Sequence, residues 1–123
     1  MADDGCLARA DEARQKALAL VRELRLVEYW SDVGRVISVG AVAYDLVVPP
    51  DIDFEVVTPG APSISAGFRV LAALAEHPLV SKTRFWNALS TPDQGLYWQI
   101  RCLDDRDQEW KVDVWTLAED HPG

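Results

Sequence analysis

The spacing of apolar residues changes along this chain, and each change predicts a helix, a strand or a turn. Near the start, Ala17, Leu20 and Leu24 recur at the spacing of one helix face, with arginine and glutamate residues nearby. This spacing predicts a long amphipathic helix from about Ala8 to Tyr29, within an N-terminal segment, residues 1–30, that precedes the rest of the fold.

Two strands are predicted in the first half of the chain. The β-branched run from Arg35 to Val39 is typical of a buried strand. Residues 41–46 can then form a short helix, which Pro49-Pro50 ends because proline cannot continue it. From Asp51 to Val57 acidic and apolar residues alternate, as in a strand that buries one face.

The second half predicts one further helix and three strands. Ser63 or Ser65 can cap the helix, because a serine oxygen accepts the unpaired amide hydrogens of a first turn. His77-Pro78 ends the apolar stripe that follows. The three strand-like segments are Val80–Leu89, Leu96–Leu103 and Glu109–Leu117, separated by polar linkers that we interpret as hairpin turns.

The resulting order is α-β-α-β-α-β-β-β, which predicts an α+β fold. We expect a mixed β-sheet with helices packed mainly on one face. With 123 residues, nearly half of them apolar, and no linker or repeat, the chain is expected to form a single domain, residues 1–123, with its main part at residues 35–117.

Composition narrows the classes of partner. The chain has 20 acidic and 12 basic residues, a net charge of -8 and no run of lysine or arginine, so a long nucleic acid is an unfavourable partner. The start is acidic and no apolar stretch approaches the roughly 20 residues that span a bilayer, so we expect a cytoplasmic protein without membrane attachment. Cys6 and Cys102 are expected to be reduced thiols.

The predicted strands place several carboxylates on one face. Asp51, Asp53 and Glu55 point to one side of their strand, because residues two apart share a face. The apolar residues between them fix the other side in the core. Asp113 lies in the middle of the last strand among apolar neighbours, where an unpaired charge is costly. A cation or a basic residue is therefore expected close to these aspartates.

These residues carry a resemblance to a known family. Gly40-Ala41, then Asp51-Ile52-Asp53, then Asp113 in the run Lys111-Val112-Asp113 resemble the signature of the polymerase-beta-like nucleotidyltransferase superfamily. That signature is a Gly-Ser or Gly-Gly pair, an Asp-x-Asp motif and a third aspartate on a later strand. The resemblance covers about residues 36–117 and implies a nucleotidyltransferase-like fold in a minimal, single-domain member.

The resemblance implies an enzyme that moves a nucleoside monophosphate from a nucleoside triphosphate to a small-molecule or protein acceptor and releases pyrophosphate. Asp51, Asp53 and Asp113 would be the catalytic residues and would hold Mg²⁺ or Mn²⁺, and Asp113 can also act as a base. Gly40 and Ala41 would bind the triphosphate through backbone amides. Lys111 is a candidate phosphate contact.

The chain departs from the family pattern at two points. Ala41 stands where the family most often has serine, and the lost hydroxyl contact, worth on the order of 1.5 to 3 kcal/mol, would reduce activity roughly ten- to hundred-fold. The sequence also ends soon after Asp113, as in the minimal members. Such a chain can complete its site by forming a homodimer or by binding a separate partner protein, and it can equally be a truncated part of a longer protein.

Simpler interpretations of the same residues stay open. Asp51 can be a turn residue after Pro49-Pro50, and Asp53 a solvated strand residue. Asp113 can be a structural ion-pair partner of a basic residue, the candidates being Lys82, Arg84 and Arg101. As a whole, the chain can also be a non-catalytic member of the fold that binds nucleotide, metal or a protein partner, for instance as a toxin-antitoxin component, or a hydrolase or lyase that uses the same carboxylates.

Overall fold

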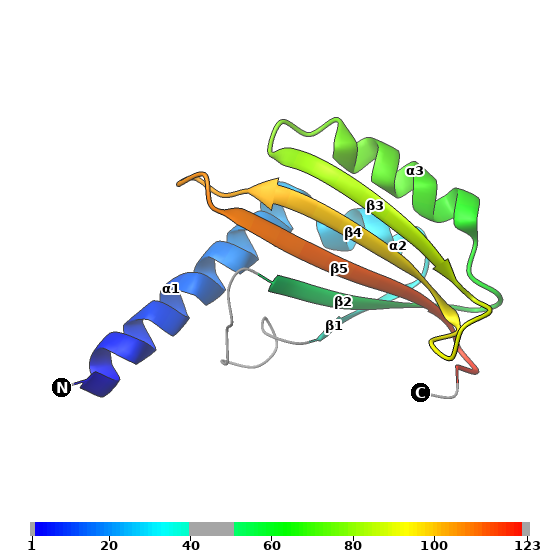
Figure 1. Ribbon diagram of the computed structural model, residues 1–123, viewed down its shortest axis with the longest axis horizontal. Helices are drawn as coiled ribbons and strands as arrows, with labels where there is room; N and C mark the ends of the chain where they lie inside the picture. Colours follow the sequence, from blue (N-terminus) through cyan, green and yellow to red (C-terminus); the bar gives the residue numbers. More distant parts are fainter. Residues whose placement is uncertain (1, 40–50, 122–123) are drawn as a thin grey trace.

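The computed structural model describes residues 2–39 and 51–121, which form an α+β fold (Figure 1). This part of the chain contains three helices and one five-stranded mixed sheet. The elements are α1 (Ala2–Glu23), α2 (Leu26–Ser31), β1 (Arg35–Val39), β2 (Asp51–Thr58), α3 (Ile64–Ala75), β3 (Val80–Ala88), β4 (Gly95–Leu103) and β5 (Glu109–Ala118). The short helix expected at residues 41–46 lies outside the described residues.

The sheet has the strand order β1-β2-β5-β4-β3. The neighbours β2 and β5 are parallel, whereas the other three pairs are antiparallel. A parallel pair needs a crossover connection, and here α3, β3 and β4 lie between the two strands in sequence. The segments β3, β4 and β5 follow one another as hairpins, in agreement with the turns predicted from the polar linkers.

The N-terminal helix differs from the prediction, because it is two helices. Arg25 has the left-handed conformation, with φ 53°, and ends the continuous helix that was expected from Ala8 to Tyr29. The physical reason lies in Leu24 and Leu26, which are both 1% exposed. Residues two apart point to nearly opposite sides of one helix, so only a turn between them allows both side chains to reach the core.

The helices pack on one face of the sheet, and Figure 1 shows α2 behind the strands and α3 running alongside β3. Side chains of all three helices share a single hydrophobic core with the alternate, fully buried residues of β2, β4 and β5. Trp98 lies in this core, and its ring centroid is 4.4 Å from that of Phe85 and 5.9 Å from that of Trp30. The opposite face of the sheet is not covered by any of these helices.

Local signals set the ends of the other elements. Ser63 caps α3, and its Oγ accepts a hydrogen bond of 3.2 Å from the Ala66 amide. Ser65, the alternative candidate, lies inside the helix. Cys102 is a buried free thiol on β4. Among the described helices, none has the length and apolar character needed to cross a membrane.

Candidate functional site

The face of the sheet opposite the helices carries the aspartates. Along β2 and β5 fully buried residues alternate with partly exposed ones, and the partly exposed set includes Asp51, Asp53 and Asp113. In the parallel pairing of these strands, Asp53 is the partner of Asp113 and Asp51 is the partner of Lys111. Because neighbouring strands lie about 4.8 Å apart, the two pairs form a compact polar cluster.

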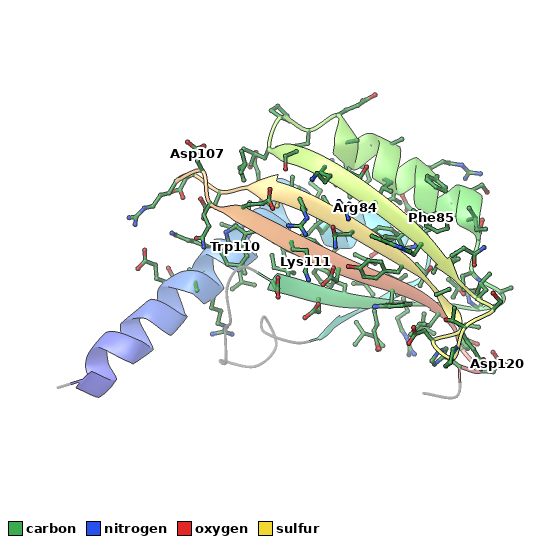
Figure 2. All side chains as sticks on the ribbon, viewed as in Figure 1. Arg84, Phe85, Asp107, Trp110, Lys111 and Asp120 are labelled. Atoms are coloured by element: carbon green, nitrogen blue, oxygen red, sulfur yellow. The ribbon has the colours of Figure 1, made fainter. Side chains whose placement is uncertain are left out.

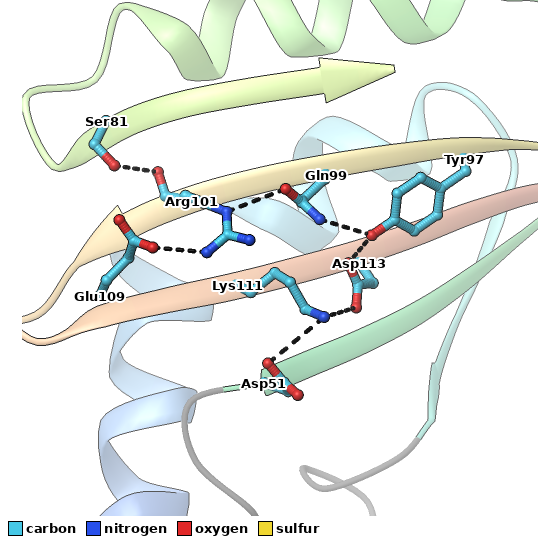
Figure 3. A network of polar contacts seen from close by, with 8 residues as sticks. All are labelled: Asp51, Ser81, Tyr97, Gln99, Arg101, Glu109, Lys111 and Asp113. Carbon is cyan, nitrogen blue, oxygen red and sulfur yellow. Dashed lines mark hydrogen bonds and ion pairs between the residues drawn. The ribbon is translucent and has the colours of Figure 1, made fainter. Parts of the chain in front are cut away.

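Lys111 supplies the counter-charge within this cluster (Figure 3). Its Nζ lies 3.3 Å from Asp113 Oδ2 and 4.0 Å from Asp51 Oδ1. The side chain of Asp113 is 15% exposed, and that of Asp51 is 44% exposed, so the first ion pair is the better shielded from water. The ion pair of Asp113 is therefore with Lys111, and not with the predicted candidates Lys82, Arg84 or Arg101.

Asp53 experiences repulsion from both other aspartates. Its pKa is raised above 3.8 first by burial and then by the charges of Asp113 and Asp51, and Lys111 opposes this shift only in part. Asp53 is partly exposed, and the two neighbouring aspartates distinguish it from an isolated residue on a strand. Close carboxylates of this kind are stabilised when a cation lies between them.

Tyr97 on β4 holds Asp113 from the side opposite Lys111. Its hydroxyl donates a hydrogen bond to Asp113 Oδ1 and accepts one of 3.0 Å from Gln99 Nε2. Arg101 Nε donates to Gln99 Oε1 over 3.1 Å, and Arg101 Nη1 lies 2.7 Å from Glu109 Oε1. Figure 3 shows this chain of contacts running across β4 and β5.

The Tyr97 hydroxyl is a stable donor for Asp113. Burial, followed by the hydrogen bond to Asp113, raises the pKa of Tyr97 to about 12, so the hydroxyl keeps its proton at neutral pH. Neither Tyr97 nor Gln99 was identified from the sequence. The alternation along β4 could have placed both on the open face, but only the register shows that Gln99 is the partner of Asp113.

Asp51, Asp53 and Asp113 offer carboxylate oxygens, which Mg²⁺ and Mn²⁺ prefer as ligands, and substrate phosphates usually supply further ligands to such cations. As the side chains stand, no three or more His, Cys, Asp or Glu residues within 2–39 and 51–121 are gathered as a metal site. Lys111 lies between Asp51 and Asp113, and its flexible four-carbon stem allows the ammonium to move aside.

The expected phosphate-binding residues Gly40 and Ala41 lie outside the described residues. Strand β1 ends at Val39, whose pairing partner on β2 is Asp53. Val39, the residue before Gly40, therefore lies beside Asp53 in the sheet.

A scan against protein-family models finds no matching family, and a search of the curated proteins finds no similar protein. The function therefore has to be inferred from the residues and their geometry.

Proposed function

We propose that this protein is a nucleotidyltransferase of the polymerase-beta-like type. It transfers a nucleoside monophosphate from a nucleoside triphosphate to an acceptor hydroxyl or amine and releases pyrophosphate. The observation that carries the proposal is the pairing of Asp53 with Asp113 on the parallel neighbours β2 and β5, with Asp51 on the same face. This pairing supports the resemblance because residues that are 60 positions apart in sequence meet at one point.

In this proposal, Asp51, Asp53 and Asp113 hold Mg²⁺ or Mn²⁺. When bound, divalent cations stabilise the attacking and leaving oxygens of an in-line displacement at phosphorus. The register supports this assignment, because Asp53 faces Asp113 across the parallel strand pair. Burial, followed by the charges of Asp113 and Asp51, raises the pKa of Asp53, and Lys111 offsets this only in part.

The reaction assigns separate tasks to the chain's own residues. The acceptor oxygen or nitrogen forms a bond to the α-phosphorus, the bond from that phosphorus to the bridging oxygen breaks, and pyrophosphate leaves with the electron pair. Asp113 accepts the acceptor's proton, while Tyr97 keeps its carboxylate in position. Lys111 neutralises the carboxylates before the substrate arrives and then contacts a phosphate oxygen.

The experiment that tests this function measures triphosphate binding by calorimetry with Mg²⁺, with Mn²⁺ and with EDTA, followed by pyrophosphate release. We expect metal-dependent binding that Asp53→Asn weakens by at least tenfold, because each carboxylate contributes to holding the metal. Asp105→Asn, an exposed position in the turn after β4, is the matched control and should bind as the wild type does. Binding that is absent, or equal with EDTA and in both variants, would contradict the proposal.

A second candidate function is a non-catalytic protein with the same fold. The observation in its favour is the ion pair of Lys111 with Asp113, which places a built-in cation at the carboxylates. In that case Lys111→Met should increase divalent cation binding without producing any pyrophosphate release. Metal-dependent pyrophosphate release by the wild type in the presence of an acceptor would exclude this candidate.

A further inference from the structure

The open face of the sheet also carries two rows of side chains, and of these only Tyr97 and Lys111 take part in the proposed chemistry. The pairing of β3, β4 and β5 aligns Trp86, Tyr97 and Trp115 in one line across the strands, which we call the aromatic row. The same pairing aligns Lys82, Arg101 and Lys111 in a second line, the basic row. Between the two lines, Arg84 is the partner of Gln99, which in turn pairs with Asp113.

The aromatic row is continuous and accessible. The ring centroids of Trp86 and Tyr97 are 5.3 Å apart, and those of Tyr97 and Trp115 are 5.1 Å apart, with tilted planes in both pairs. Trp86 is 47% exposed, although tryptophan is usually well buried. An exposed aromatic surface beside polar groups is typical of a binding site for a planar ring.

Two basic residues on this face have no carboxylate partner among the residues that the structure describes. Arg101 and Lys111 are held by Glu109 and Asp113, whereas Lys82 and Arg84 form no ion pair within residues 2–39 and 51–121. Both are exposed, and the Arg84 guanidinium carbon lies 5.9 Å from the Trp86 ring centroid. Figure 2 shows Arg84 and Lys111 on the sheet. This corner of the face therefore combines an aromatic ring with unneutralised positive charge.

We propose that the β3–β4 half of the open face binds a mononucleotide, which is the acceptor of the transfer. Its base stacks on Trp86 and Tyr97, and its phosphate binds Arg84 and Lys82. That this mononucleotide is the acceptor rests on the proposed function, and the strand order is the observation that supports it. Asp51 and Asp53 belong to β2, next to the end of β1, and hold the donor, whereas β3 and β4 lie on the other side of β5.

Asp113 on β5 lies between these two halves. A hydroxyl of the bound mononucleotide gives its proton to Asp113, its oxygen forms the bond to the donor's α-phosphorus, and pyrophosphate leaves with the electrons of the broken bond. The product is a dinucleotide. A monomeric acceptor fits better than a nucleic acid because the net charge of -8 repels an extended phosphate backbone.

The test is calorimetry with AMP, GMP, CMP and UMP in EDTA, with adenosine and inorganic phosphate as partial ligands. We expect a nucleoside monophosphate to bind at least tenfold more tightly than either partial ligand, because only the whole molecule uses both groups. Trp86→Ala and Arg84→Ala should each weaken this binding about tenfold, and Arg84→Lys should restore part of it. Arg69→Ala, at an exposed position of α3, is the matched control and should not change it.

Several results would overturn the inference. The first is that adenosine or inorganic phosphate alone binds as tightly as the nucleoside monophosphate. The second is that Trp86→Ala and Arg84→Ala bind the nucleoside monophosphate as tightly as the wild type does. The third is that a ten-nucleotide single strand binds more tightly than the nucleoside monophosphate. Displacement of AMP by a non-hydrolysable triphosphate with Mg²⁺ would show that the surface belongs to the donor. Binding of AMP in EDTA without any metal-dependent triphosphate binding would refute the proposed function but leave the mononucleotide site standing.

Discussion

Asp104 shows how a single carboxylate fixes the turn that aligns β4 with β5. Its Oδ1 accepts hydrogen bonds from the amides of Arg106 (2.8 Å) and Gln108 (2.9 Å), and its Oδ2 accepts one from Trp110 Nε1 (2.9 Å). Burial alone would raise the pKa of this carboxyl, which is 5% exposed, but the three hydrogen bonds outweigh burial and lower it below 3.8. The charged form of Asp104 is therefore stabilised by folding.

Replacing Asp104 should destabilise the protein in a pH-dependent way. At pH 7 we expect Asp104→Asn to lower the free energy of unfolding by about 1.5–3 kcal/mol, because charge-assisted hydrogen bonds are lost. The folded-state pKa is depressed, so the wild-type contribution is present above pH 3.8 and is lost as the pH falls through the folded value. Urea unfolding from neutral to acidic pH should show the two proteins converging. A constant difference, or a similar loss in the exposed control Asp105→Asn, would contradict this account.

Tyr97 has two roles that a single substitution can separate. Tyr97→Phe keeps the ring of the aromatic row but removes the hydroxyl that holds Asp113. Loss of that positioning should slow metal-dependent pyrophosphate release about tenfold, with triphosphate and mononucleotide affinity unchanged. Steady-state kinetics should therefore show a lower kcat at constant KM. An unchanged kcat would show that the hydroxyl does not position Asp113.

At the scale of elements, α3 packs against the sheet only because it carries a glycine. A Cβ atom at Gly67 would lie 2.1 Å from Trp98 Cζ2 and within 2.6 Å of two further ring atoms. Trp98 is fully buried, and its Nε1 donates a hydrogen bond of 3.1 Å to Thr116 Oγ1, so the ring has little freedom to move. The helix therefore approaches the sheet as closely as its backbone allows.

Gly67→Ala should lower the free energy of unfolding by about 1–3 kcal/mol, because overpacking outweighs the better helix propensity of alanine. Gly60→Ala is the matched control, since a Cβ there meets nothing within 4 Å, and its stability should stay near that of the wild type. Chemical denaturation of both variants checks the difference. Equal stability of Gly67→Ala and the wild type would show that α3 can shift outward at little cost.

The elements were predictable from the sequence where periodicity was strong. The five strands and α3 follow from alternation, β-branched residues and turn signals, and the strand ends differ from the prediction by at most one residue. The break at Arg25 was not predictable, because the helical spacing of apolar residues continues past it into α2. The burial of both Leu24 and Leu26 causes the break between α1 and α2, and no local signal in the sequence indicates this break.

For the whole molecule, the strand order decides what the candidate site can do. The sequence indicates that Asp51 and Asp53 share a face, but it does not show that β5 is inserted beside β2, which pairs Asp53 with Asp113. The same order places Tyr97 on β4 and Trp86 on β3, on the side of β5 away from β2. Such long-range pairings depend on how the whole chain folds, so local patterns in the sequence could not give them.

The central claim is that Asp53 and Asp113 act together as ligands of one metal-bound triphosphate. The most direct measurement is a double-mutant cycle on the Mg²⁺-dependent affinity for the triphosphate, using Asp53→Asn, Asp113→Asn and the double variant. Because both residues hold the same ions, the account predicts that the double variant loses little more affinity than either single variant. Losses that simply add, or no loss in any variant, would contradict it.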